Sequence, residues 1–337
     1  MKCSVSHYVR PGNMSKPLAK LIIRLLLVAS LSDIGAGHKV NAQNCEPSSQ
    51  RKISLSVVNK EGQSVYNLHP EDLTISENKA SLEILKLELR TNEPLSVAIL
   101  IDTSASQERV LAGTKLAAQK FVESILRSNK DRASLVSFTG QVTVEQELTN
   151  DLTRLRAAID RIKFVPPPGY VRGGVVVGST PPSRRQILLG ATAIWDAIWA
   201  TVERIKPGAD SRRVIVLITD GEDTVSEMKL RDAIKQAATN DVAIFSLGIA
   251  DSNYGLNRDS LKRLSEETGG RAFFPKKVAD LEAIFFETAQ ALQSQYVLSY
   301  CSAHQKTAAK PLKIEIEVKN PQLRGSNLQL LYSHYGL

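Results

Sequence analysis

Aliphatic runs alternate with amphipathic segments between residues 94 and 296. The strand-like runs include "SVAILID" (96–102), "RASLVSF" (132–138), "VTVEQEL" (142–148), "RRVIVLITD" (212–220) and "VAIFSLGIA" (242–250). Helix-like segments with apolar residues at helical spacing lie at 107–128, 151–162, 192–205, 227–240, 258–270 and 278–293. A continuous aliphatic run such as 214–218 is typical of a strand covered on both faces. The pattern predicts an α/β fold, a doubly wound, mostly parallel sheet with helices on both sides.

Shorter runs that alternate apolar and polar residues flank this region. Three precede it, at 51–58, 72–78 and 82–89, and three follow it, at 295–301, 310–319 and 327–333. Period-two alternation with turn residues between the runs predicts antiparallel strands. Because such a small sheet is seldom stable alone, we expect the N-terminal and C-terminal flanks to pack together as one small β-unit.

The first 42 residues differ from the rest of the chain. A basic stretch leads into an apolar run, and Val40-Asn41-Ala42 places small residues where a signal peptidase cleaves, so we predict a secretory signal peptide at 1–42. An uncleaved membrane anchor is the alternative, although Arg24 interrupts a run that is shorter than the ~20 residues of a membrane span. We therefore expect a secreted, periplasmic or cell-envelope protein with β segments at 43–93 and 297–337 around a domain at 94–296.

Charge and cysteine content limit the possible functions. The net charge of +8 comes mostly from the leader, which has six Lys or Arg and one Asp, so residues 43–337 carry 37 basic and 34 acidic side chains, or +3. Without a basic stripe interleaved with aromatic residues, nucleic-acid binding is not expected. Cys45 and Cys301 are the two cysteines that remain after cleavage. In an oxidising compartment they are expected to form a disulfide, with two unrelated buried thiols as the alternative.

Three strand-to-helix junctions carry oxygen ligands. Asp102, Ser104 and Ser106 follow one aliphatic run, Thr192 begins a helix, and Asp220 follows another aliphatic run. In an open α/β sheet, ligands bind beyond the carboxyl ends of the strands. Two carboxylates and three hydroxyls without His or Cys suit Mg²⁺ or Mn²⁺ better than zinc. The alternative is that these residues only cap helices.

This arrangement resembles the von Willebrand factor type A (VWA) domain with its metal-ion-dependent adhesion site (MIDAS), whose pattern is Asp-x-Ser-x-Ser, a later Thr and a later Asp. The flanks resemble the secreted bacterial branch of that family. The resemblance implies a Rossmann-like VWA fold, a bound Mg²⁺ or Mn²⁺ ion that accepts an Asp or Glu of a partner protein, and no enzymatic activity. A metal-dependent hydrolase and a structural envelope scaffold with a vestigial metal site are the alternatives. Gln107, Glu108 and Arg109 depart from the family, in which Met often follows the second Ser.

The loop from Phe164 to Gln186 is long and rich in Pro and Gly. Long loops in compact domains are often functional, and we expect this one to lie beside the metal site. Its side chains Tyr170, Arg172, Arg184 and Arg185 are candidates for a rim that contacts an acidic partner, with a mobile surface insertion as the alternative. A phosphate loop would need a Lys that "GGVVVGST" lacks, so nucleotide binding is not expected.

Two further groups of side chains have structural interpretations. Trp195 and Trp199, four residues apart on one helix, are expected to pack rather than to form a ligand platform. Glu222 and Asp223 are expected to be solvated loop acids or helix-start residues rather than metal ligands.

Overall fold

The structure is a computed structural model. It describes residues 45–60, 63–91, 93–127, 129–166, 170–171, 174–175, 190–205, 211–251, 255–302 and 312–336. The predicted signal peptide lies outside these residues. Among the described residues, no helix is both long and apolar enough to span a membrane.

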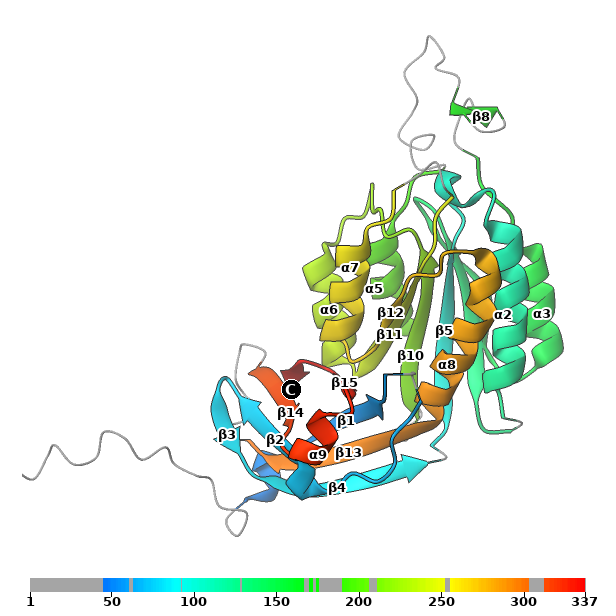
Figure 1. The fold of residues 1–337 in the computed structure, drawn as a ribbon. Coiled ribbons are helices and arrows are strands. Elements are labelled where there is room, and N and C mark those ends of the chain that lie inside the picture. The colour runs from blue at the N-terminus through cyan, green and yellow to red at the C-terminus, as the bar shows by residue number, and fades with distance from the viewer. Residues whose placement is uncertain are drawn as a thin grey trace, which may run out of the picture. The chain divides into compact units, whose positions relative to one another are not determined.

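A six-stranded sheet forms the centre of the fold, with the strand order β12-β11-β10-β5-β6-β7 (Figure 1). Its strands are β5 (Leu95–Asp102), β6 (Arg132–Phe138), β7 (Val142–Thr149), β10 (Arg212–Thr219), β11 (Val242–Gly248) and β12 (Ala272–Phe273). All neighbours pair in parallel except β6 and β7, which are antiparallel. The predicted doubly wound, mostly parallel sheet is confirmed.

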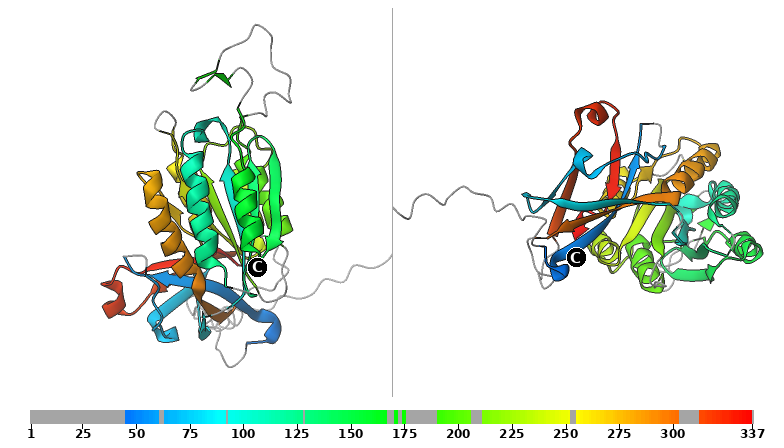
Figure 2. Two further views of the ribbon diagram at one scale, coloured as in Figure 1. Left: turned by 90° about the vertical axis from the view of Figure 1, so that its right-hand side faces the viewer. Right: turned by 90° about the horizontal axis from the view of Figure 1, so that it is seen from below.

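Helices cover both faces of this sheet. The first face packs against α2 (Leu111–Ile125), α3 (Leu152–Arg161) and α8 (Leu281–Gln293), and the second against α5 (Ile194–Arg204), α6 (Leu230–Thr239) and α7 (Arg258–Glu267). Figure 2 shows α8, α2 and α3 side by side. Ile99 and Ile101 of β5 lie in the first core and Ala98 and Leu100 in the second, all fully buried. Burial on both faces is why the strands have continuous apolar runs.

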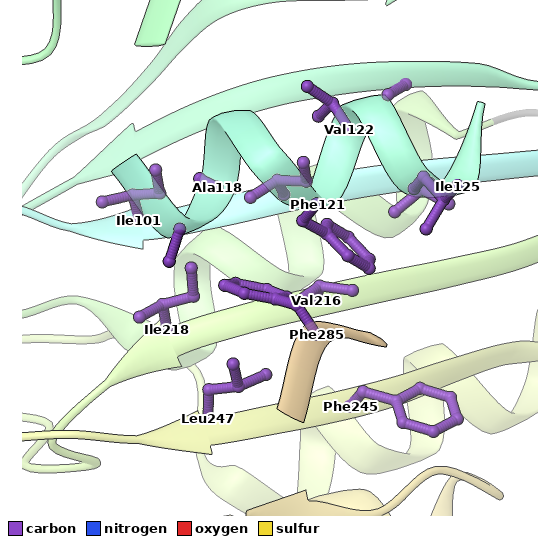
Figure 3. Close-up of a cluster of buried hydrophobic side chains, with 14 of the residues drawn as sticks. Ile101, Ala118, Phe121, Val122, Ile125, Val216, Ile218, Phe245, Leu247 and Phe285 are labelled. Atoms are coloured by element: carbon purple, nitrogen blue, oxygen red, sulfur yellow. The ribbon is translucent and has the colours of Figure 1, made fainter. Parts of the chain in front are cut away.

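Aromatic stacking joins α2 to α8 in the first core. The rings of Phe121 and Phe285 have centroids 4.6 Å apart, and both side chains are buried (Figure 3). Phe286, the next residue on α8, is 60% exposed. The helix therefore buries one stripe and leaves the adjacent face in solvent.

The two flanks of the chain combine into a β-sandwich. One sheet has the order β15-β1-β13-β4 and the other β16-β14-β2-β3. Their strands are β1 (Gln50–Val58), β2 (Leu73–Glu77), β3 (Ala80–Leu82), β4 (Ile84–Thr91), β13 (Ser294–Cys301), β14 (Leu312–Val318), β15 (Gln329–Tyr332) and β16 (Tyr335–Gly336). Ile53, Leu55 and Val57 of β1 point into the shared core, whereas Lys52 and Ser54 lie on the other face. The expected β-unit from both flanks is present, and it contains two sheets.

A disulfide joins the two flanks. Cys45 precedes β1 and Cys301 ends β13, and their Cα atoms are 5.8 Å apart. β1 and β13 pair antiparallel with Gln50 opposite Cys301, which brings the start of one strand to the end of the other.

The remaining described elements are short. They are the 3₁₀ turns η2 (Pro47–Ser49), η3 (Pro70–Asp72), η4 (Ala105–Gln107) and η5 (Val278–Asp280), the hairpin strands β8 (Tyr170–Val171) and β9 (Gly174–Val175), and helix α9 (Pro321–Arg324). The predicted helix from residue 107 therefore begins later, because a 3₁₀ turn comes first and α2 starts at Leu111.

Candidate metal centre at the carboxyl edge of the sheet

The loops after β5 and β10 meet at the carboxyl edge of the central sheet. These two strands are direct neighbours, paired from Leu95 opposite Arg212 to Ile101 opposite Ile218. Asp102 directly follows Ile101, and Asp220 follows Thr219, the last residue of β10, so both carboxylates emerge at the same edge. Ligand sites of open α/β sheets occur at such places.

The first loop folds its polar side chains together. Asp102 Oδ1 accepts a hydrogen bond from the Ser104 backbone N at 2.8 Å, and the hydroxyls of Ser104 and Ser106 lie 3.3 Å apart. Asp102 Oδ2 accepts a second bond from Thr219 Oγ1 at 2.6 Å. Asp102, Ser104 and Ser106 are exposed by only 1%, 1% and 8%. This loop thus holds a carboxylate and two hydroxyls in one buried group.

The second loop turns sharply after Asp220. Gly221 has φ +82°, and a Cβ atom there would lie 2.8 Å from Leu261 Cγ and 2.9 Å from the Asn257 carbonyl oxygen. Only Gly adopts this conformation without strain in so small a space. The turn directs Asp220 Oδ1 to the Glu222 backbone N at 3.0 Å, while Asn257 N donates to the Asp220 carbonyl. Asp220 is 2% exposed.

Thr192 lies on a third loop that is joined to both others. Its backbone N donates to Thr224 Oγ1 at 2.9 Å, and its carbonyl accepts from Thr224 N at 2.9 Å, so it is bound to the loop of Asp220. Two residues earlier, the Gly190 carbonyl accepts from Ala105 N at 3.3 Å on the first loop. Thr192 itself is buried. The structure therefore brings the three sequence-predicted junctions together.

Asp223 caps the start of α5, a helix that precedes it in the chain. Its Oδ1 atom accepts from Ile194 N, the first residue of α5, at 2.7 Å and from Ser226 Oγ at 2.6 Å. Burial raises the pKa of this half-buried carboxyl. Asp223 therefore lies at a helix start, as expected, and the helix is α5, which comes before it in the sequence. Glu222 beside it is exposed.

The electrostatics of the site are unfavourable without a cation. Burial, followed by the charge of Asp220, raises the pKa of Asp102 from 3.8 to about 7. Burial also raises the pKa of Asp220. In the described part of the chain, neither carboxylate has a salt bridge to Lys, Arg or His. Nor do three His, Cys, Asp or Glu residues cluster there as metal ligands, so any ion would depend on hydroxyl oxygens as well.

Two buried residues near these acids were missed from sequence. Thr219 ends β10 and donates to Asp102, and its place inside an aliphatic run made it indistinguishable from an ordinary strand residue. Gln107 is 2% exposed, and its Nε2 atom lies 3.4 Å from Ser106 Oγ and 3.3 Å from the Ile249 carbonyl. Its position directly after the second Ser was the available signal.

The predicted rim of the site consists of Tyr170, Arg172, Arg184 and Arg185. Tyr170 lies in strand β8, while Arg172, Arg184 and Arg185 lie outside the described residues. Arg109 forms a salt bridge of 3.3 Å with the buried Asp251.

The two tryptophans of α5 differ in exposure. Trp195 is 7% exposed and belongs to the second core, consistent with packing. Trp199 is half-buried and donates to Glu203 at 3.2 Å.

Two family models match the α/β part of the chain. Both describe a von Willebrand factor type A domain, one over residues 97–222 and one over residues 184–287. The chain belongs to the von Willebrand factor type A domain family. The two matches together contain all five candidate ligand positions of the VWA domain, and their limits fall within the α/β part of the chain.

Relatives of this VWA protein are found among curated sequences and solved structures. Inter-alpha-trypsin inhibitor heavy chain H2 is 29% identical over 187 residues in Mus musculus and 30% in Mesocricetus auratus, each match covering 53% of this chain and 18% of the relative. The match thus spans less than a fifth of these relatives. A von Willebrand factor type A structure from Catenulispora acidiphila has a TM-score of 0.48 at 13% identity, covering 85% of this chain and 74% of that one. Proximal thread matrix protein 1 from the mussel byssus, with a zinc-occupied MIDAS motif, has a TM-score of 0.46 at 14% identity, covering 60% and 49%.

Proposed function

We propose that this VWA protein binds a divalent cation, Mg²⁺ or Mn²⁺, and through it an acidic residue of a partner protein. The observation that supports the proposal is the pair of buried carboxylates, Asp102 and Asp220, for which no other described residue provides a salt bridge. Two buried acids of like charge are costly unless a cation neutralises them. A cation that binds there removes this cost.

The donor set suits a hard ion. Asp102, Ser104, Ser106, Thr192 and Asp220 would hold it, and all five offer oxygen atoms, the ligands that Mg²⁺ prefers. When bound, the ion supplies an exchangeable coordination position that a carboxylate can occupy. Because Mg²⁺ retains waters and is held by few protein ligands, an Asp or Glu of a partner can complete its shell.

Binding is favoured over hydrolysis because both buried acids are needed as metal ligands. A hydrolase would need a positioned base or nucleophile beside the ion in addition to them. The rim residues Tyr170, Arg172, Arg184 and Arg185 would contact an acidic partner around the carboxylate. Cleavage of residues 1–42 would place the protein outside the cytoplasm, as a secreted or cell-envelope module in which the sandwich positions the VWA domain.

The test is the melting temperature with a chelator, Mg²⁺, Mn²⁺ or Ca²⁺. A ligand that binds only the folded state stabilises it by about 2.7 kcal/mol at a hundred times its dissociation constant. Mg²⁺ or Mn²⁺ should raise the melting temperature of the wild type but not of Asp102→Ala or Asp220→Ala. Glu222→Ala, which removes an exposed acid beside Asp220, is the matched control and should keep the response. A wild type that responds to no ion refutes the metal site.

A further inference from the structure

A polar cavity of about 340 Å³ lies at the edge of the sheet opposite the metal centre. Its walls come from the amino ends of β10 and β11 and from the outer face of the sandwich sheet that contains β1 and β13. Figure 1 shows β1 and β13 below the start of β10. Ligand cavities of a few hundred Å³ occur preferentially where two such parts of a chain meet.

The cavity is fixed on two sides. On one side, the half-buried Arg212 guanidinium donates to the Ala291 and Leu292 carbonyls at 3.2 and 2.9 Å and to Ser56 Oγ at 3.0 Å, which links β10, α8 and β1. On the other, Gly269 has φ +83°, and a Cβ atom there would lie 2.7 Å from the Ser333 backbone N. The sandwich and the α/β domain are thus held together around a preformed space.

Four cations and two acids line the cavity, and their pairing differs. Arg90 is bonded to Glu93 at 2.7 Å, and Arg212 is committed to the contacts above. Arg213 and Lys52 form no salt bridge among the described residues. Arg213 Nε is buried and has no hydrogen-bond partner within the same residues, whereas the Lys52 side chain is exposed. Neither Arg213 nor Lys52 is thus held by a direct salt bridge there, and Arg213 acts on Asp241 through its charge alone.

We propose that this cavity binds a carboxylate-bearing ligand of amino-acid or peptide chemistry through Arg213 and Lys52. A guanidinium recognises a carboxylate through charge-assisted, directional hydrogen bonds. Asp241 on the same wall suits an ammonium or amide N–H and disfavours a compact dianion such as phosphate. Ser54 and Gln295, on the facing sheet, offer a hydroxyl and an amide for the peptide groups of such a ligand. The proposal is independent of the metal centre.

Isothermal titration calorimetry on the purified protein tests this site. The protein is freed of metal with a chelating resin and kept without EDTA, because EDTA itself carries carboxylates. Glutamate, triglutamate and inorganic phosphate are the separate probes. Saturable binding of glutamate identifies a free amino acid as sufficient, and binding of triglutamate alone identifies a peptide; both support the proposal. Binding of phosphate as tightly as of either carboxylate overturns it, as does no saturable binding of any probe.

Substitutions of the two cavity cations test whether the carboxylate probe binds in this cavity. Arg213→Gln should weaken it roughly tenfold, as expected for one lost charged hydrogen-bonded contact. Lys52→Gln should weaken it several-fold, and because Lys52 is exposed this variant does not depend on refolding of a buried group. Arg154→Gln, on the exposed surface of α3, is the control and should leave the dissociation constant unchanged. An unchanged constant in both Arg213→Gln and Lys52→Gln refutes the assignment.

Discussion

Replacing Asp102 with Asn should stabilise the metal-free protein. The carboxyl is 1% exposed, and burial and the charge of Asp220 raise its pKa from 3.8 to about 7. Each tenfold change in an acid dissociation constant is about 1.4 kcal/mol, so the charged form costs the folded state about 4 kcal/mol. Asn keeps the Oδ1 acceptor for Ser104 N and carries no charge. The variant loses only the bond from Thr219 to Oδ2, worth about 1 kcal/mol.

The upward shift of the Asp102 pKa defines the pH range in which the two proteins should differ in stability. Because the folded-state pKa lies above the unfolded value, the stability that the protonated carboxyl provides is full below pH 4 and is lost as pH rises to about 7. Asn has no such loss. In EDTA, the free energy of unfolding of Asp102→Asn should therefore exceed that of the wild type by about 3 kcal/mol at pH 8, and this excess should disappear near pH 4.

Urea denaturation in EDTA at pH 4, 6 and 8 measures these differences. Glu71→Gln, which neutralises an exposed acid of the sandwich, should follow the wild type at every pH. Adding Mg²⁺ at pH 8 should shrink the difference, by about 2.7 kcal/mol at a hundred times the dissociation constant, because only the wild type gains stability from the ion. If the difference between Asp102→Asn and the wild type does not change from pH 4 to pH 8, the two carboxylates do not oppose each other and the reasoning fails.

Three further predictions concern the stacked core, the disulfide and the buried Gln107. Phe285→Ala should cost about 3–5 kcal/mol of unfolding free energy, because its ring is buried, while Phe286→Ala, at an exposed position, should cost under about 1 kcal/mol; equal losses would contradict the stacked core. Cys45→Ser with Cys301→Ser should lower stability by roughly 2–5 kcal/mol in urea under oxidising conditions, since the bond spans 256 residues, and an unchanged midpoint would show that it is dispensable. Gln107→Leu should cost about 1–3 kcal/mol by leaving the buried Ile249 carbonyl without its side-chain donor, and a loss within error would show that water replaces it.

The α/β fold was predictable because its signal is local. Runs such as 214–218 are apolar on both faces, so their periodicity alone identified strands of a covered parallel sheet. The start of α2 was less predictable. Residues 105–107 form a 3₁₀ turn, and its Ser and Gln side chains bind each other and the β11 end instead of continuing a helix.

The sandwich shows where local pattern stops being informative. Alternation identified its strands, but it does not specify which of two sheets a strand joins. That choice depends on pairings between the two flanks, such as β1 with β13 and β2 with β14. The same limit applies to the site: oxygen ligands at strand ends are visible in sequence, whereas the support from Thr219 comes from a neighbouring strand.

Strand β10 connects the proposed metal centre to the proposed cavity. β5 and β10 carry Asp102 and Asp220 at their carboxyl ends, and β10 begins with the cavity residues Arg212 and Arg213. Eight residues at about 3.3 Å each separate the two edges by roughly 26 Å, so one acidic side chain cannot reach both sites. Each site should thus be occupied by its own carboxylate. The dissociation constant for glutamate or triglutamate should then be the same with and without Mg²⁺; a several-fold change would demonstrate coupling through the sheet and require two conformations of these strands.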